Sequence, residues 1–165
     1  MNILHQIISN GYILITPILL WNMFLTKRLP PAYEPKSFNA GIPRTISIGE
    51  RIGRILIFGL PFFIKLNFSS TIGKTGLIVY AAGAAIYFLS WILLIAVPQS
   101  RWCKSMIGFT APAHTIIYWL AGLTLAADSF YFGIPFSRWY LIVPVTVMSV
   151  FHGAHAVYVW RRTYR

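Results

Sequence analysis

Residues 76–97 read GLIVYAAGAAIYFLSWILLIAV, contain no charged side chain and are followed directly by Pro98. In a helix, about 20 consecutive apolar residues are enough to cross the roughly 30 Å of hydrocarbon in a bilayer. The stretch therefore predicts a transmembrane helix.

Four further apolar stretches have the length and flanks of membrane spans, and they cover residues 3–25, 47–67, 109–127 and 139–160. The second of these is the least regular. Its uninterrupted apolar core, residues 55–64, contains Pro61 and lies between Arg54 and Lys65. It crosses the bilayer only if both cations extend their side chains to the interfaces.

The composition excludes a soluble globular domain and a disordered chain. Hydrophobic residues make up 57% of the 165 residues, and charged residues only 10%. Soluble domains carry roughly 25% charged residues, and disordered chains are poor in apolar side chains. We therefore predict an all-α protein in which residues 1–165 form a single domain, a bundle of five transmembrane helices in the cell (inner) membrane.

The distribution of charge predicts how this bundle is oriented. The net charge is +11, and cations concentrate on the cytoplasmic side of multi-pass membrane proteins. With the N-terminus outside and the C-terminus cytoplasmic, three of the 14 Lys and Arg residues, Lys65, Lys74 and Arg138, lie outside and the remaining eleven inside. Cations at helix ends attract anionic lipid, so the predicted partners are membrane lipids and not nucleic acid.

Residues 26–45 form the longest connection between the predicted spans. Four prolines prevent one continuous helix there and favour an extended strap along the cytoplasmic surface. They are Pro30, Pro31, Pro35 and Pro43.

Two of the stretches present faces of small residues. Gly83 lies among alanines in the third stretch, and Gly122 and Ala126 lie four residues apart in the fourth. Small residues let helix backbones approach closely in lipid. These faces predict a helix contact, either within one chain or with a second copy or another membrane protein.

Three of the four histidines lie in the fourth and fifth predicted spans, and counting 1.5 Å per residue places these three at one depth, about 5–12 Å below the cytoplasmic surface. Polar side chains in hydrocarbon are costly and mark functional sites. We therefore predict a ligand-binding pocket on the cytoplasmic side, formed by His114, His152, His155, Glu50, Arg51, Tyr118 and Ser149. Glu50 has a second interpretation, because Ser47-x-x-Glu50 fits a capping box that would only hold a helix start.

Histidine and carboxylate side chains permit several chemistries. His114, His152 and His155 are potential metal ligands, and His114 opposite either of the others could hold haem. A histidine could also act as a general base. The sequence contains no HExxH, GxSxG, CxxC or Walker motif that would assign a reaction.

These observations are compatible with three classes of function. The leading hypothesis is a membrane protein whose pocket binds or transports a lipidic or amphipathic anionic ligand, with apolar walls for its body and His and Arg for its head group. The second is a redox, metal-dependent or haem-dependent membrane enzyme that uses the same histidines. The third is a structural or assembly subunit that acts through its small-residue faces.

Overall fold

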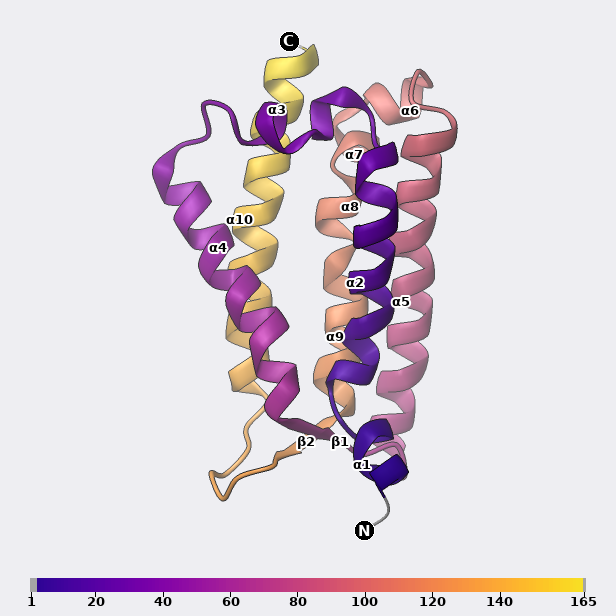
Figure 1. The fold of residues 1–165 in the computed structure, drawn as a ribbon, viewed down its shortest axis with the longest axis vertical. Helices are drawn as coiled ribbons and strands as arrows, with labels where there is room; N and C mark the ends of the chain where they lie inside the picture. The colour runs from indigo at the N-terminus through magenta and orange to yellow at the C-terminus, as the bar shows by residue number, and fades with distance from the viewer. Residues whose placement is uncertain (1–2, 165) are drawn as a thin grey trace.

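The fold is seen in a computed structural model that describes the backbone of residues 3–164 and the side chains of residues 6–164. The chain is all-α in character, with 77% of it helical. Helices stand side by side along the long axis of the molecule, with the N-terminus at one end and the C-terminus at the other (Figure 1). In chain order they are α1 (Ile3–Ile8), α2 (Tyr12–Leu25), α4 (Arg44–Gly59), α5 (Thr71–Ala96), α7 (Met106–Phe109), α8 (Ala111–His114), α9 (Ile116–Ala126) and α10 (Trp139–Tyr164).

Within the described residues, two helices are long and apolar enough to cross a membrane, namely α5 and α10 with 26 residues each. The prediction of five complete spans is therefore not confirmed. Every predicted stretch does contain helix, but three of the five are interrupted or short.

Local chemistry explains the interruptions. In the first stretch, Asn10 and Gly11 separate α1 from α2. The fourth stretch breaks at Thr110 and Thr115, whose hydroxyls donate to the carbonyls four residues earlier at 2.8 and 2.7 Å. Such bonds bend helices, and between them Pro112 lies in the first turn of the short helix α8.

The second stretch ends earlier than predicted, because α4 ends at Gly59 and Pro61 lies in the 3₁₀ turn η3 (Leu60–Phe63). The chain then forms β1 (Ile64–Leu66), which pairs antiparallel with β2 (Ala127–Phe130). This two-stranded sheet closes the end of the molecule where the N-terminus lies (Figure 1). No pattern in the sequence predicted it.

Two helix pairs are joined through glycine. A Cβ atom at Gly76 of α5 would lie 2.5 Å from the backbone nitrogen of Ala126, and one at Gly83 would lie 2.5 Å from the carbonyl carbon of Tyr118. On α4, a Cβ at Gly53 would lie 2.8 Å from the Met148 Cα of α10. The glycine faces therefore hold α5 against α9 and α4 against α10 within one chain.

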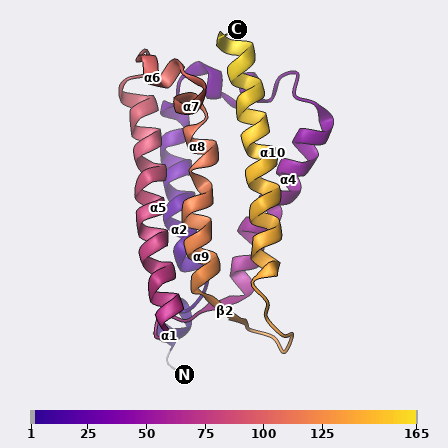
Figure 2. The same cartoon turned by 180° about the vertical axis from the view of Figure 1, so that it is seen from behind.

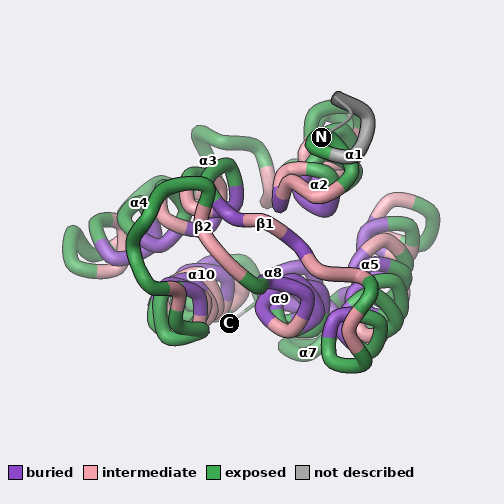
Figure 3. Tube along the Cα trace, turned by 90° about the horizontal axis from the view of Figure 1, so that it is seen from below, coloured by how far each residue is buried: buried purple, intermediate pink, exposed green. Residues whose placement is uncertain are grey.

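Viewed along its axis, the bundle has α4 and α10 on one side and α2, α5 and α9 on the other (Figure 3). Buried residues face the space between these two groups, and exposed residues cover the outside.

The predicted strap crosses the end of the bundle from which the C-terminus of α10 emerges (Figures 1 and 2). It contains the 3₁₀ turns η1 (Thr26–Arg28) and η2 (Pro31–Tyr33) and the short helix α3 (Pro35–Asn39), so it is less extended than predicted. Pro31 and Pro35 occupy first-turn positions, where a missing N–H costs no hydrogen bond. The short helix α6 (Arg101–Lys104) lies at the same end.

Candidate functional site

Glu50 lies at the centre of a polar cluster between α4 and α10, in which Glu50 and His155 are buried and the side chain of Arg54 is 55% exposed. Glu50 is 5% exposed, and its oxygen Oε1 lies 3.0 Å from Nδ1 of His152. Oε2 is hydrogen-bonded to Nδ1 of His155, and the guanidinium of Arg54 donates to Oε1. The capping-box interpretation is wrong, because α4 begins at Arg44 and places Ser47 inside the helix.

Glycine explains how a carboxylate reaches this position. Gly49 and Gly53 flank Glu50 on the face of α4 that contacts α10, and side chains there would collide with Phe151 and Met148. The close backbone approach lets the short Glu50 side chain reach histidines on the next helix.

The hydrogen bonds of His155 fix the number of protons shared by the Glu50–His155 pair. Its Nε2 lies 3.0 Å from the carbonyl oxygen of Phe38, which only accepts, so Nε2 carries a hydrogen. Its Nδ1 faces Glu50, so either His155 is an imidazolium facing a carboxylate or Glu50 is protonated and donates to a neutral ring. Both arrangements leave this pair with no net charge, and the positive charge of Arg54 is then unbalanced.

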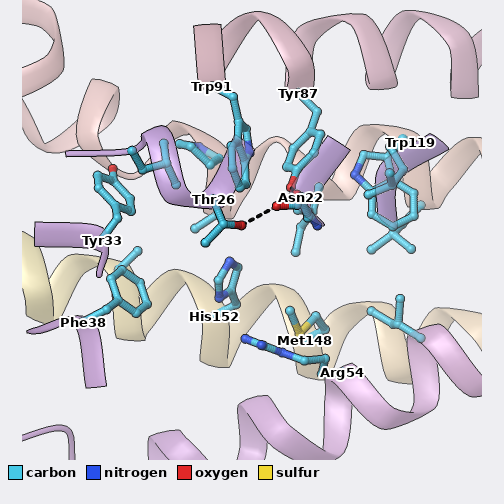
Figure 4. Close-up of a pocket in the computed structure, with 18 of the residues that line it drawn as sticks. Asn22, Thr26, Tyr33, Phe38, Arg54, Tyr87, Trp91, Trp119, Met148 and His152 are labelled. Atoms are coloured by element: carbon cyan, nitrogen blue, oxygen red, sulfur yellow. Dashed lines mark hydrogen bonds between the residues drawn. The ribbon is translucent and has the colours of Figure 1, made fainter. Parts of the chain in front are cut away.

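His152 differs from His155 because only one of its ring nitrogens is occupied. Nδ1 donates to Glu50, while Nε2 has no partner among the described residues. A carboxylate behind a histidine fixes its tautomer and makes the second nitrogen a better proton acceptor. The ring points from α10 into a cavity, toward Thr26 on the opposite wall (Figure 4).

The cavity lies between the two helix groups and measures about 270 Å³. This is near the lower end of the roughly 300–1,000 Å³ found for ligand pockets. Its walls are mainly aromatic and aliphatic, and the aromatic residues are Tyr33, Phe38, Phe58, Tyr87, Trp91, Phe109 and Trp119. A small amphipath, or one end of a larger one, fits this volume.

Several hydrogen-bond donors in the cavity lack a protein acceptor. The indole N–H of Trp119 has no partner in the described part of the chain, although this residue is only 2% exposed. Asn22 accepts a 2.6 Å bond from the Tyr87 hydroxyl through Oδ1, which leaves its amide hydrogens available. An unpaired buried donor costs about 1–3 kcal/mol, so a ligand with acceptor oxygens would be stabilised here.

The strap closes the cavity at the C-terminal end of the bundle. The ring of Phe38 stacks on His155 at a centroid distance of 4.3 Å. The Tyr33 hydroxyl donates to the carbonyl of Phe109, and burial raises the pKa of this hydroxyl far above its ordinary value, so it remains a donor. Arg162 of α10 donates to the carbonyls of Ser37 and Ala40.

The structure brings together three of the seven predicted site residues, Glu50, His152 and His155. Of these three, His152 lines the cavity. The other four lie outside both the cluster and the cavity lining: His114, Tyr118 and Arg51 are exposed, and Ser149 is half-buried with a hydroxyl that has no partner in the described residues.

The structure does not bring the three predicted histidines into one pocket. His114 lies on the outer face, where its Nδ1 is 3.4 Å from the Thr110 hydroxyl. It does not face His152 or His155 across a cavity, as a haem-ligating pair would. The described residues contain no group of three or more His, Cys, Asp or Glu side chains arranged to hold a metal ion.

The cavity also contains residues that the predicted site omitted, mainly Asn22, Tyr87 and Trp119. Arg54, which the sequence places near the mouth of the predicted pocket, lines the cavity too; it lies four residues after Glu50, which puts both on one helix face. No local pattern identified Asn22 or Trp119, whose role depends on how the helices are rotated.

Comparison of the chain with protein-family models, curated proteins and solved structures finds no match. A function must therefore be inferred from the geometry and chemistry of the cavity.

Proposed function

We propose that this protein is an integral membrane protein whose cavity binds a lipidic or amphipathic anion taken from the cytoplasmic leaflet. Binding would be the recognition step of carriage or transport of that molecule. All five helical stretches of the chain would cross the membrane, and the strap would lie on the cytoplasmic surface.

Exposed apolar side chains support the membrane assignment. Ile78 on α5 is 70% exposed, Ile55 on α4 is 65% exposed and Val150 on α10 is 59% exposed. Apolar residues exposed on several helices would form patches far larger than those of soluble monomers. Lipid would cover them, including on α4, which is shorter than a typical span.

The chemistry of the cavity supports an anionic head group. The Glu50–His155 pair is electrically neutral in either of its protonation arrangements, so Arg54 gives the cluster at least one net positive charge. The free donors of Asn22 and Trp119 require acceptor oxygens. The aromatic walls would hold an apolar chain or ring.

One observation carries the proposal: the unpartnered nitrogen of His152 and the guanidinium of Arg54 belong to one carboxylate-centred cluster beside an apolar cavity. A polar cluster that served only packing would have its buried groups satisfied within the protein, whereas the free nitrogen of His152 belongs to a side chain that lines the cavity.

Three ten-carbon probes that differ only in the head group test this proposal. Sodium decanoate, decanol and decyltrimethylammonium are added to the purified chain in mild detergent, and thermal unfolding is measured. A ligand that binds the folded state raises the melting temperature, so we expect stabilisation by decanoate that exceeds the effect of the other two.

Arg54→Gln should remove this selective stabilisation. Arg51→Gln is the matched control, because Arg51 is an exposed arginine on the same helix that does not line the cavity. Equal shifts with all three probes, or equal effects of the two arginine variants, would contradict the proposal.

A further inference from the structure

His152 is the one histidine of the cluster able to exchange a proton with a molecule in the cavity. Both ring nitrogens of His155 are hydrogen-bonded, one to Glu50 and the other to the Phe38 carbonyl. In His152, Nδ1 is hydrogen-bonded to Glu50, while Nε2 has no partner among the described residues and is available to a molecule in the cavity. A ligand head group beside this wall therefore meets a site that either accepts or donates a hydrogen bond, according to its protonation.

The charged groups around His152 determine which protonation state of its ring is favoured when an anion binds. From α4 it faces Glu50 and Arg54, and its own helix adds His155. The strap and α5 contribute the neutral hydroxyls of Tyr33 and Tyr87, while α8 and α9 contribute no titratable side chain to the cavity. The charges next to the ring are thus one carboxylate, which stabilises an imidazolium, and one guanidinium, which attracts the anion.

An unprotonated Nε2 presents a lone pair, which repels the lone pairs of a carboxylate or phosphate oxygen. A protonated Nε2 instead donates a charge-assisted hydrogen bond, roughly twice as strong as a neutral one. The anion and the proton should therefore enter the site together.

We propose that the cavity is a proton-coupled site for single-chain amphipathic acids, in which the ligand binds as its anion while one proton is held on Nε2 of His152. This inference rests on the proposed function and specifies its ligand and its regulation. Starting from a dissolved carboxylate, binding consumes one proton from solution: the anion, one proton and neutral His152 give the anion hydrogen-bonded to the imidazolium. No covalent bond forms or breaks in the ligand.

Calorimetry of decanoate binding in several buffers of different ionisation enthalpy tests this inference, because the dependence of the measured heat on the buffer gives the number of protons taken up. For the unmodified protein we expect an uptake of about one proton per decanoate over the pH range in which His152 is neutral before binding. Affinity should then fall by up to about tenfold per pH unit as the pH rises.

His152→Gln keeps a neutral N–H donor at this position but removes the titrating group, so its proton uptake should be near zero and its affinity independent of pH. The matched control is His114→Gln, which alters an exposed histidine outside the cavity and should keep the full uptake. Because the primary measurement uses the unmodified protein, the inference remains testable even if His152→Gln does not fold.

The possible outcomes separate the two proposals. Decanoate binding without proton uptake would overturn proton coupling and leave the proposed function standing. Binding of decanoate no tighter than binding of decanol would overturn both. Proton uptake that persists in His152→Gln would assign the proton to another group and overturn the proposed role of His152.

Discussion

Replacing Gly83 with alanine should separate α5 from α9 and destabilise the bundle. A Cβ atom at this position would lie 2.5 Å from the Tyr118 carbonyl carbon, 2.8 Å from the Tyr118 Cβ, and closer still to the Trp119 backbone nitrogen. Carbon atoms in contact normally lie about 3.5–4.0 Å apart. The helix backbones must therefore separate by about 1 Å, because no flexible side chain can move aside.

The size of the effect follows from this separation. Inserting one methyl group into a packed interface costs about 1–3 kcal/mol, and the backbone contact places Gly83→Ala at the upper end of this range. For a chain of this size, each kcal/mol lowers the melting temperature by about 2–4 °C. We therefore expect a decrease of about 6–12 °C for thermal unfolding in mild detergent.

Gly153→Ala is the matched control for this experiment. Gly153 lies within α10, and a Cβ atom there would meet nothing within 4 Å. Alanine is a better helix former than glycine by about 0.5–1 kcal/mol, so this variant should be as stable as the original or slightly more so. If the two variants unfold at the same temperature, the close contact between α5 and α9 does not exist as described.

Three further predictions concern the cluster, the strap and the orientation. Glu50→Ala should lower the free energy of unfolding by about 1–3 kcal/mol because it leaves the buried Nδ1 of His155 without its partner, whereas the exposed Glu34→Ala should change it little; similar losses in chemical denaturation would contradict the cluster. Tyr33→Phe removes one hydrogen bond of the strap, worth about 1 kcal/mol, and should increase proteolysis within residues 26–43; unchanged cleavage would mean that this bond does not hold the strap. Cysteines replacing Lys36 and Lys74 should react with an impermeant maleimide from opposite sides of the membrane, and labelling from one side would refute the orientation.

Continuous apolar sequence predicted the two longest helices well. The stretches 76–97 and 139–160 correspond to α5 (Thr71–Ala96) and α10 (Trp139–Tyr164). In both cases the apolar pattern extends over more than five turns, and α10 continues through Pro144 and through the hydroxyl bond of Thr146 to the Ile142 carbonyl without a break. The other stretches were apolar enough to be recognised, but Asn10, Pro61 and Thr110 altered their geometry locally in ways that hydropathy does not report.

The site was predictable where its residues share one helix face or, as for Glu50, lie at the cytoplasmic start of a predicted span. His152 and His155 lie three residues apart, so they were expected to act together, and both contact Glu50. The position of His114 depended on how the fourth stretch is rotated about its axis. Packing of Gly122 against Tyr80 fixes that rotation and turns Trp119 inward and Tyr118 outward. A contact between distant segments thus determined which side chains of this stretch reach the cavity.

A single carboxylate connects the cavity with the strap that covers it. Glu50 orients His152 toward the cavity, and it also holds His155, whose second nitrogen binds the strap through the Phe38 carbonyl. A change at Glu50 should therefore affect ligand binding and protection of the strap together, whereas a change at Tyr33 should affect the strap without altering the charge of the cavity.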